Sequence, residues 1–139
     1  MQQVTAEVLF GASALARLGA LAGSGEWQDL LFASRNATVF QHPSYVLGWY
    51  ASHADHYEPV VVLGRTPTQR LAGLWLLARQ RRAGRLVQAG HHQSAHLITD
   101  AQPDAERTFV ATAQRALAIA LGVPEIDIGT VPMPPRELD

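Results

Sequence analysis

Histidine and serine side chains gather in one polar segment of the chain, GHHQSAHLITDAQ at residues 90–102. Three of the six histidines lie there, and Ser94 stands two residues before His96. Imidazole titrates near neutral pH, so a histidine can act as a general base that takes a proton from an attacking nucleophile. We therefore expect His96 and Ser94 to be the catalytic residues. The alternative is a polar loop at the edge of a sheet that has no chemical role.

No metal site is expected from the histidines of this chain. His92 and His96 are four residues apart, a spacing that would place both on one face of a helix. Their neighbours Gly90 and Thr99 do not favour a helix, and no glutamate accompanies them. A second group, HADH at residues 53–56, follows a predicted helix, where histidines can bond the last carbonyl groups and complement the helix dipole.

The densest group of charges is the segment RQRRAGR at residues 79–85, which contains four arginines and one glycine. The planar guanidinium group presents paired donors that match the oxygens of a phosphate. Arg81, Arg82 and Gly84 are therefore the candidate cofactor-binding residues. The alternative is a hairpin turn whose charges are simply solvated.

The hydrophobic pattern predicts the elements that must position these groups. Strand-like segments cover residues 4–10, 59–63, 71–78, 86–89 and 125–128. Helical spacing marks residues 24–34 with Ser24 as N-cap, a segment that opens with Pro43 in its first turn, and a long segment capped by Asp104. Residues 13–21 are rich in alanine and glycine and only weakly patterned as a helix, and the order of elements given below does not count them. Residues 90–102 are expected to form a loop.

Two short connections join three successive strands, which indicates an antiparallel meander. The run LWLL at residues 74–77 lacks polar alternation, so its strand should be central and covered on both faces. The fold class is α+β, with helices packed on a mostly antiparallel sheet in the order β-α-α-β-β-β-α-β. The helix before the last strand is a crossover, which should place that strand parallel to a neighbour.

Composition restricts the classes of function. The 139 residues, 47% of them hydrophobic and 17% charged, suit one folded domain, residues 1–139. A net charge of −1 argues against a binder of nucleic acid or of anionic membranes. The chain has no cysteine, which excludes disulfides and thiolate chemistry. No apolar run approaches the length of a membrane span, and no secretory signal precedes the domain, so a cytoplasmic location is expected.

The most specific segment is the run TVFQHPSYVLGWY at residues 38–50, in which Phe40, Gln41, Pro43 and Trp49 are the main points. It resembles the opening of a family of bacterial acyltransferase-like proteins, the GNAT-related proteins grouped with cellulose-biosynthesis CelD and, more distantly, with the FemAB peptidyltransferases. The resemblance covers residues 26–131 and includes the Arg-rich turn. Residues 90–97 form its third piece. There Ser94 matches a Ser-Asp-Tyr signature of the family, whereas Ala95 and His96 replace the Asp and Tyr.

The resemblance implies a GNAT-like fold. It also implies that two GNAT-like halves pack together in the whole protein and have different roles. The second half of these proteins looks like the one that binds acyl-CoA, so this chain resembles an N-terminal half that is not active alone. The implied reaction moves an acyl group from acetyl-CoA or another acyl-CoA to an amine. The implied partner is the missing C-terminal half.

Two other interpretations remain open. The chain could be a non-catalytic interaction module that has kept the fold and uses an exposed sheet edge to bind a partner or a second copy, as a homodimer. It could also be a compact enzyme that uses the Arg-rich turn at residues 79–85 for coenzyme A.

Overall fold

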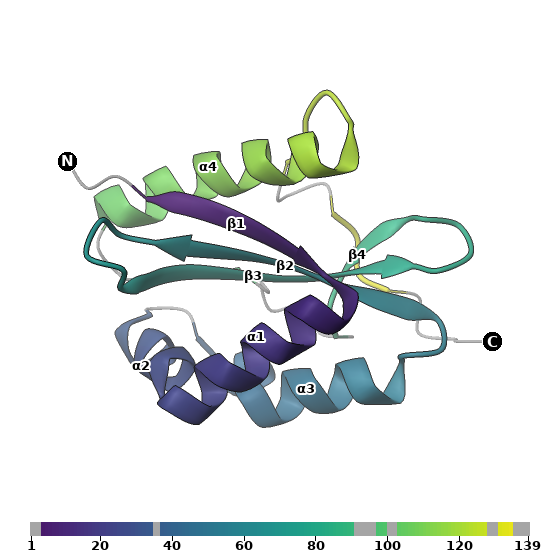
Figure 1. Cartoon of the computed structure of the whole chain (residues 1–139), viewed down its shortest axis with the longest axis horizontal. Coiled ribbons are helices and arrows are strands. Elements are labelled where there is room, and N and C mark those ends of the chain that lie inside the picture. Colours follow the sequence, from purple (N-terminus) through teal and green to yellow (C-terminus); the bar gives the residue numbers. More distant parts are fainter. Residues whose placement is uncertain (1–3, 35–36, 91–96, 100–102, 128–130, 135–139) are drawn as a thin grey trace.

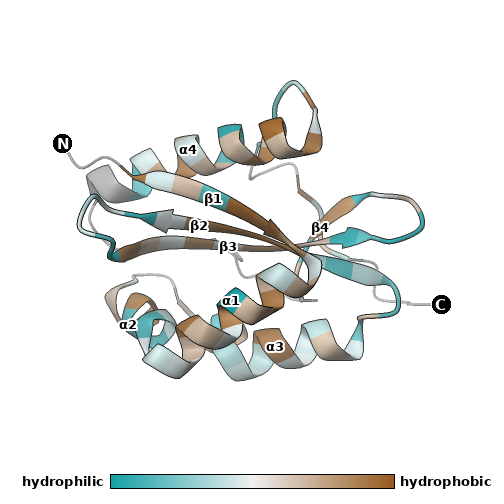
Figure 2. Ribbon diagram, in the orientation of Figure 1, coloured by the Kyte–Doolittle hydropathy of each residue, from teal (hydrophilic) through white to brown (hydrophobic). Residues whose placement is uncertain are grey.

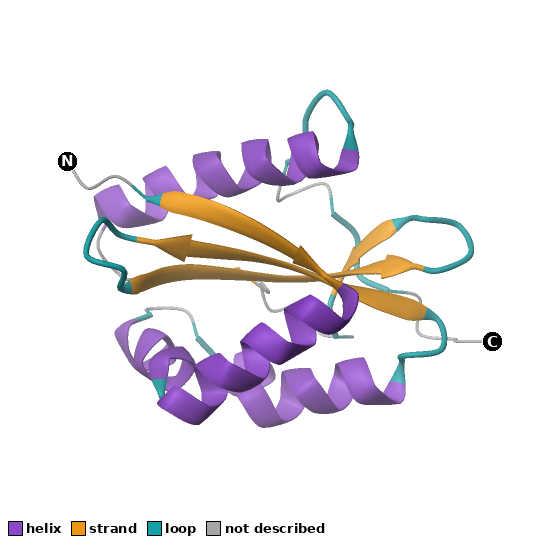
Figure 3. Cartoon of the chain, in the orientation of Figure 1, coloured by secondary structure: helices purple, strands orange, loops and turns teal. Residues whose placement is uncertain are grey.

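The computed structural model describes residues 4–34, 37–90, 97–99, 103–127 and 131–134. A five-stranded antiparallel sheet separates two layers of helices (Figure 1). Helices α1, α2 and α3 cover one face, and α4 covers the other, as the secondary-structure colouring in Figure 3 makes clear. The elements are β1 (Thr5–Phe10), α1 (Gly11–Ser24), α2 (Glu26–Ala33), the 3₁₀ turn η1 (Val39–Gln41), α3 (Pro43–Ser52), β2 (Tyr57–Arg65), β3 (Leu71–Gln80), β4 (Leu86–Gln88), β5 (Leu97–Thr99) and α4 (Pro103–Leu121).

The sheet follows the order β1-β2-β3-β4, and β5 also pairs with β3. All four pairings are antiparallel, so the predicted α+β class and the meander β2-β3-β4 are confirmed. The side chains of Leu74, Trp75, Leu76 and Leu77 are all at most 1% exposed. The expectation that this strand is central and covered on both faces is therefore confirmed.

Alternation along β2 and β3 sorts the buried side chains into two cores. Val61, Leu74 and Leu76 join the core that faces α1, α2 and α3. Val60, Trp75 and Leu77 join the core beneath α4. Figure 2 shows both strands as hydrophobic over most of their length. Because neither face of these strands meets water, their sequences read as continuous apolar runs rather than as alternating ones.

Two glycines let α4 approach the sheet closely. Gly64 of β2 and Gly73 of β3 are register partners, and the ring of Phe109 lies over both. A Cβ atom built on either glycine would come within 2.3 Å of that ring. Phe109 itself is fully buried. The pair therefore forms a recess in the sheet that only a residue without a side chain can provide.

The observed order of elements differs from the predicted order at three points. Three α-helices, rather than two, separate β1 from β2. The segment expected to be a loop contains β5, Leu97–Thr99. Among the described residues that follow α4, none is in a strand, so the expected parallel strand at residues 125–128 is wrong as far as Asp127. Instead, the extended residues Val131 and Pro132 offer their carbonyl groups to Gln88 of β4, at 3.0 and 2.9 Å.

Two predicted helix starts are also displaced. Ser24 ends α1, and Gly25, in the left-handed conformation at φ 85°, is both the C-cap of α1 and the N-cap of α2. The Ser24 hydroxyl still accepts a hydrogen bond from the Glu26 N–H, at 3.3 Å. Helix α4 starts at Pro103, so Asp104 lies inside it instead of capping it. Proline suits a first helical turn because its missing N–H would have no partner there.

Candidate functional site

The edge of the sheet beside β3 is interrupted near its middle. Strand β5 pairs with β3 from Gly73 to Trp75, and β4 pairs with it from Leu77 to Arg79. Leu76 alone lies between these two blocks, and its carbonyl accepts a hydrogen bond from the Ala89 N–H at 3.1 Å. Ala89 and Leu97 are therefore set against adjacent residues of β3, Leu76 and Trp75. We refer to this position as the strand break.

In the sequence, the predicted catalytic residues fall between β4 and β5, the two strands that flank the strand break. His96 and Ser94, together with His91 and His92, lie outside the described residues. The two flanks of the segment are placed: Ala89 and Gly90 are nearly fully buried on one side, and Ile98 and Thr99 are buried on the other. Both ends of this polar segment are therefore anchored in the sheet.

Thr99 links β5 to α4 at the same edge. The residue is 6% exposed, and its hydroxyl donates a hydrogen bond to Glu106 Oε2 at 2.9 Å. A hydrogen bond to a carboxylate is stronger than one between neutral groups. The contact ties the second flank of the break to the helix that follows it. Sequence inspection gave no sign of it, because the two residues belong to different predicted elements.

Tyr50 supports β3 next to the strand break. Its hydroxyl donates a hydrogen bond of 2.7 Å to the backbone carbonyl of Leu77, the residue that follows Leu76. Burial raises the pKa of the Tyr50 hydroxyl far above its ordinary value. The group is therefore a neutral donor at all physiological pH values, and its place in the site is to hold the strand rather than to exchange protons.

The segment at residues 38–50 acts chiefly as the frame for Tyr50. Thr38 and Gln41 form a reciprocal capping box around η1, and the Trp27 indole N–H donates to the Gln41 carbonyl at 3.0 Å. The His42 Nδ1 accepts from the Ser44 N–H at 3.3 Å, and Pro43 occupies the first turn of α3 as expected. These bonds fix where α3 begins and hence which of its side chains reach the sheet.

The Arg-rich turn joins β3 to β4 and lines a shallow depression of about 410 Å³. Gly84, at φ 72°, closes the turn by donating its N–H to the Gln80 carbonyl at 2.8 Å. Arg81, Arg82 and Gly84 all line the depression, so the fold brings the three predicted cofactor-binding residues together. The turn leads into a strand, so it lacks the helix N-terminus that favours anions in phosphate-binding loops.

The four arginines of the turn are not equivalent. Arg79 pairs with Glu58 at 2.8 Å and lies over the ring of Phe10, 5.2 Å from its centroid. The Nε of Arg81 donates to the Ala54 carbonyl at 2.8 Å. Arg82 and Arg85 are exposed, and their side chains have no hydrogen-bonding or ionic partner in the described part of the chain. Those two guanidinium groups are the ones available to an external anion.

His53, the first histidine after α3, has structural partners. His53 is the C-cap of the helix, its Nδ1 lies 2.8 Å from the Trp49 carbonyl, and its ring stacks on Trp49 with centroids 4.3 Å apart. Among the residues that the structure describes, no three potential ligands lie close enough together to hold a metal ion. The interpretation of HADH as a helix terminus is therefore the one the contacts support.

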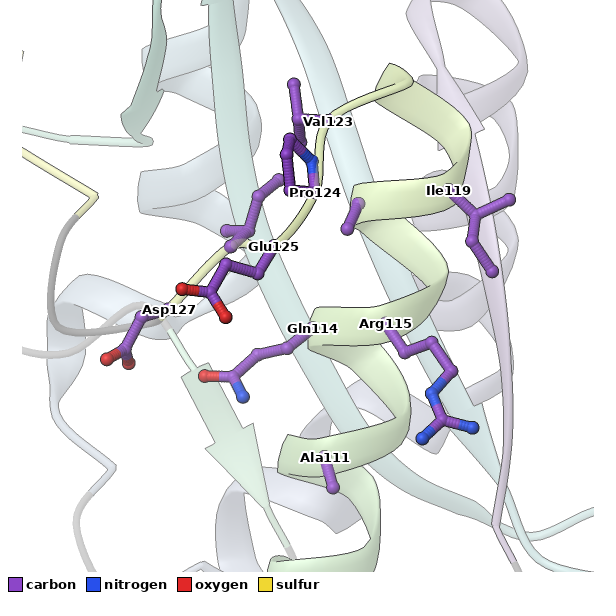
Figure 4. A pocket seen from close by; sticks show the side chains of 10 residues that line it. Ala111, Gln114, Arg115, Ile119, Val123, Pro124, Glu125 and Asp127 are labelled. Carbon is purple, nitrogen blue, oxygen red and sulfur yellow. The ribbon is translucent and has the colours of Figure 1, made fainter.

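A second cavity, also of about 410 Å³, lies between α4 and the return segment Val123–Asp127. Figure 4 shows Gln114, Glu125 and Asp127 on one flank of α4, with Arg115 and Ile119 on the other. Its lining mixes charged and apolar groups from a helix and from a segment that the sequence pattern assigned to a strand. No local motif marks it, so sequence inspection could not have found it.

Comparison of the chain with protein-family models, with curated proteins and with solved structures finds no match. The described helices include none with the length and apolar character needed to cross a membrane.

Proposed function

We propose that this chain is the N-terminal, GNAT-like half of an acyltransferase that moves an acyl group from acyl-CoA to an amine. The observation that carries the proposal is the strand break, where the edge beside β3 leaves the ladder at Leu76 and returns at Trp75. The arrangement around it agrees: a first strand, helices on one face, a meander, and a helix on the opposite face. Three helices rather than the expected two precede the meander, so the support comes from the layered arrangement and not from the order of elements.

A break in an edge strand suits acyl transfer for a physical reason. Main-chain N–H groups that no ladder uses can donate to a developing oxyanion. In the proposed reaction the amine nitrogen attacks the thioester carbonyl carbon, a C–N bond forms and the C–S bond breaks. The proton lost by the amine passes to a base, and the coenzyme leaves as a thiolate that is then protonated.

The roles of the polar side chains follow from this reaction. His96 is the proposed general base, since imidazole accepts a proton near neutral pH. Ser94 is the proposed hydrogen-bonding group for the acceptor. Both belong to the segment anchored by Ala89 and Thr99, so they would act at the strand break.

The Arg-rich turn is the proposed contact for the phosphates of the coenzyme, through Arg82, with Gly84 closing the turn. Arg81 would contribute only the guanidinium nitrogens that its bond to the Ala54 carbonyl leaves over. From Leu76 to Arg81 is five residues of extended chain, or about 17 Å. Coenzyme A is an elongated molecule with its thiol at one end and its phosphates toward the other. A separation of this order suits one ligand that reaches both the turn and the break.

The experiment is a titration of the isotopically labelled chain with acetyl-CoA, followed by amide NMR spectra. We expect changes in the amide chemical shifts of Leu76, Ala89 and Thr99 and of the turn. The affinity should be weak, because a second half would supply the remaining contacts. Arg82→Ala should raise the dissociation constant for acetyl-CoA at least about three-fold, as expected for the loss of one charge-assisted hydrogen bond.

The matched control is Arg17→Ala, which removes an exposed arginine of α1 on the opposite side of the sheet from α4. It should leave the titration unchanged. Shifts confined to the turn would contradict the role of the strand break. The absence of any shift at the break or the turn would contradict contact between this half and acyl-CoA.

A further inference from the structure

The outer edge of β1 is the open end of the sheet path. The path begins at β1, and no described strand pairs with its far side. At the other end, Val131 and Pro132 lie against β4 through hydrogen bonds to Gln88. The chain therefore covers one edge with its own return segment and leaves β1 uncovered among the described residues (Figure 1).

β1 lacks the features that normally protect an edge strand from pairing with another chain. It is six residues long and contains neither lysine nor proline, and its register with β2 runs without a bulge from Thr5 to Phe10. Its single charge belongs to Glu7, and Arg17 of α1 neutralises that carboxylate at 2.8 Å. Such an edge is suited to accept another strand.

The hydrogen-bond pattern decides which backbone groups of the sheet face which neighbour. The Ala89 N–H donates to the Leu76 carbonyl, so Leu76 faces β4, and Leu77 faces β2 because successive residues alternate. Val60 is the partner of Leu77 and faces back toward β3. Its neighbour Val61 consequently faces β1.

The same alternation continues into β1. Leu9 is the partner of Val61, so its backbone groups point inward to β2. The backbone N–H and C=O groups of Ala6, Val8 and Phe10 therefore point away from the sheet. Among the described residues of the monomer these groups have no strand to bond, and the Phe10 carbonyl, at the N-cap of α1, accepts the first bond of that helix and keeps a second lone pair for another donor.

We propose that the outer edge of β1 binds β1 of a second copy of this chain, antiparallel, about a two-fold axis at Val8. This register pairs Val8 with Val8 of the second copy and Ala6 with Phe10 of the second copy, so every outward-facing group finds a partner. Glu7 lies opposite Leu9 of the second copy. A register centred on Glu7 would set two carboxylates opposite each other, which is unfavourable.

The self-complementarity of this register is the argument for a second copy as the occupant. Two copies related by a two-fold axis offer the same groups to each other, as a closed dimer requires. The pairing would join the two sheets into one continuous sheet. The inference does not depend on the proposed acyl transfer, which concerns the edge beside β3.

The first test replaces Ala6 by proline, which removes an outward N–H that the monomer does not use. Ala6→Ser is the matched control because it keeps the amide. In sedimentation equilibrium we expect the unmodified chain and Ala6→Ser to be dimers. Ala6→Pro should keep its circular dichroism spectrum and have a dissociation constant at least about ten-fold higher, since each dimer loses two hydrogen bonds.

The second test uses the absence of cysteine from the chain, which makes single-cysteine variants unambiguous. In the proposed register the two Val8 Cα atoms are about 5.5 Å apart, within the range of a disulfide. Val8→Cys should therefore form a covalent dimer with oxidised glutathione. Thr5→Cys should not, because it faces the far end of the other strand.

Several outcomes would overturn the proposal. One is an unmodified chain that stays monomeric up to its solubility limit. Others are a dimer that Ala6→Pro does not weaken, an Ala6→Pro chain that fails to fold, and equal cross-linking of Thr5→Cys and Val8→Cys. Loss of the dimer in Ala6→Pro with an unchanged acetyl-CoA titration would support the pairing and separate it from the proposed enzymatic role.

Discussion

Gly64 and Gly73 face each other across β2 and β3, and the ring of Phe109 occupies the space that their missing side chains leave. The arrangement brings α4 close to the centre of the sheet and fixes its position along the strands. Interiors of proteins are packed closely enough that one added methyl group is felt. The pair therefore offers a direct test of how α4 is held.

Gly73→Ala should destabilise the fold by about 1–3 kcal/mol, the usual cost of overpacking a core. The added Cβ would lie 2.3 Å from the Phe109 ring, so either the ring or the helix must shift. Urea unfolding measures the change. Gly48→Ala is the control, because its Cβ would have no neighbour within 4 Å and alanine favours a helix by about 0.5–1 kcal/mol over glycine. Equal effects of the two substitutions would contradict the close approach.

Tyr50→Phe should cost about 1 kcal/mol of unfolding free energy, because it removes the hydrogen bond to the Leu77 carbonyl and leaves the ring in place. Tyr57→Phe is the matched control: Tyr57 is equally buried, but its hydroxyl has no hydrogen bond to the described residues. Chemical denaturation at neutral pH would compare the two. A larger loss in Tyr57→Phe would show that Tyr50 does not support β3 through its hydroxyl.

The same tyrosine predicts a dependence of stability on alkaline pH. Burial raises the pKa of Tyr50 in the folded state, whereas in the unfolded chain it ionises near pH 10. The unfolded state then binds fewer protons, so the stabilisation is complete below pH 10 and falls above it by about 1.4 kcal/mol per pH unit. Urea midpoints measured from neutral to alkaline pH would show this fall. The loss of unfolding free energy with rising pH should be shallower in Tyr50→Phe. An identical slope in both proteins would refute the attribution of this loss to Tyr50.

Thr38→Ala should destabilise the fold by about 0.5–2 kcal/mol through loss of the capping box at η1. The cap orders the turn that precedes α3 and holds Gln41, which is 2% exposed. Thermal unfolding is a sufficient measurement. Ser44→Ala, at an exposed hydroxyl in the next helix, should change the melting temperature much less, and comparable effects would mean that the cap is unimportant.

Much of the fold follows from local sequence patterns. The apolar run at residues 74–77 identified the central strand, and Pro43 marked a helix start, because burial and backbone geometry at these positions depend on the residues themselves. The turns on either side of β3 were also evident from the sequence. Helix α1 is longer than its weak pattern indicated, since packing of Leu18 and Leu21 against the sheet outweighs the cost of its glycines.

The features that sequence inspection missed depend on distant partners. Strand β5 is three residues long and is defined by pairing with β3, more than twenty positions earlier in the chain. Residues 125–128 alternate like a strand, yet no strand is present as far as Asp127. Further along, Gln88 of β4 donates two hydrogen bonds to the Val131 and Pro132 carbonyls. For the candidate site, residue types singled out the polar segment, whereas the break that positions it follows from sheet topology alone.

The strand break is also a position where the length of the chain can vary without a change in the register of the sheet. β3 sets the register of β4 and of β5 independently, so the edge does not need a fixed number of residues between Ala89 and Leu97. Closing a longer loop costs little, about 0.6 kcal/mol for each doubling of its length. Insertions or deletions at this point would change the size and chemistry of the segment while leaving both cores intact.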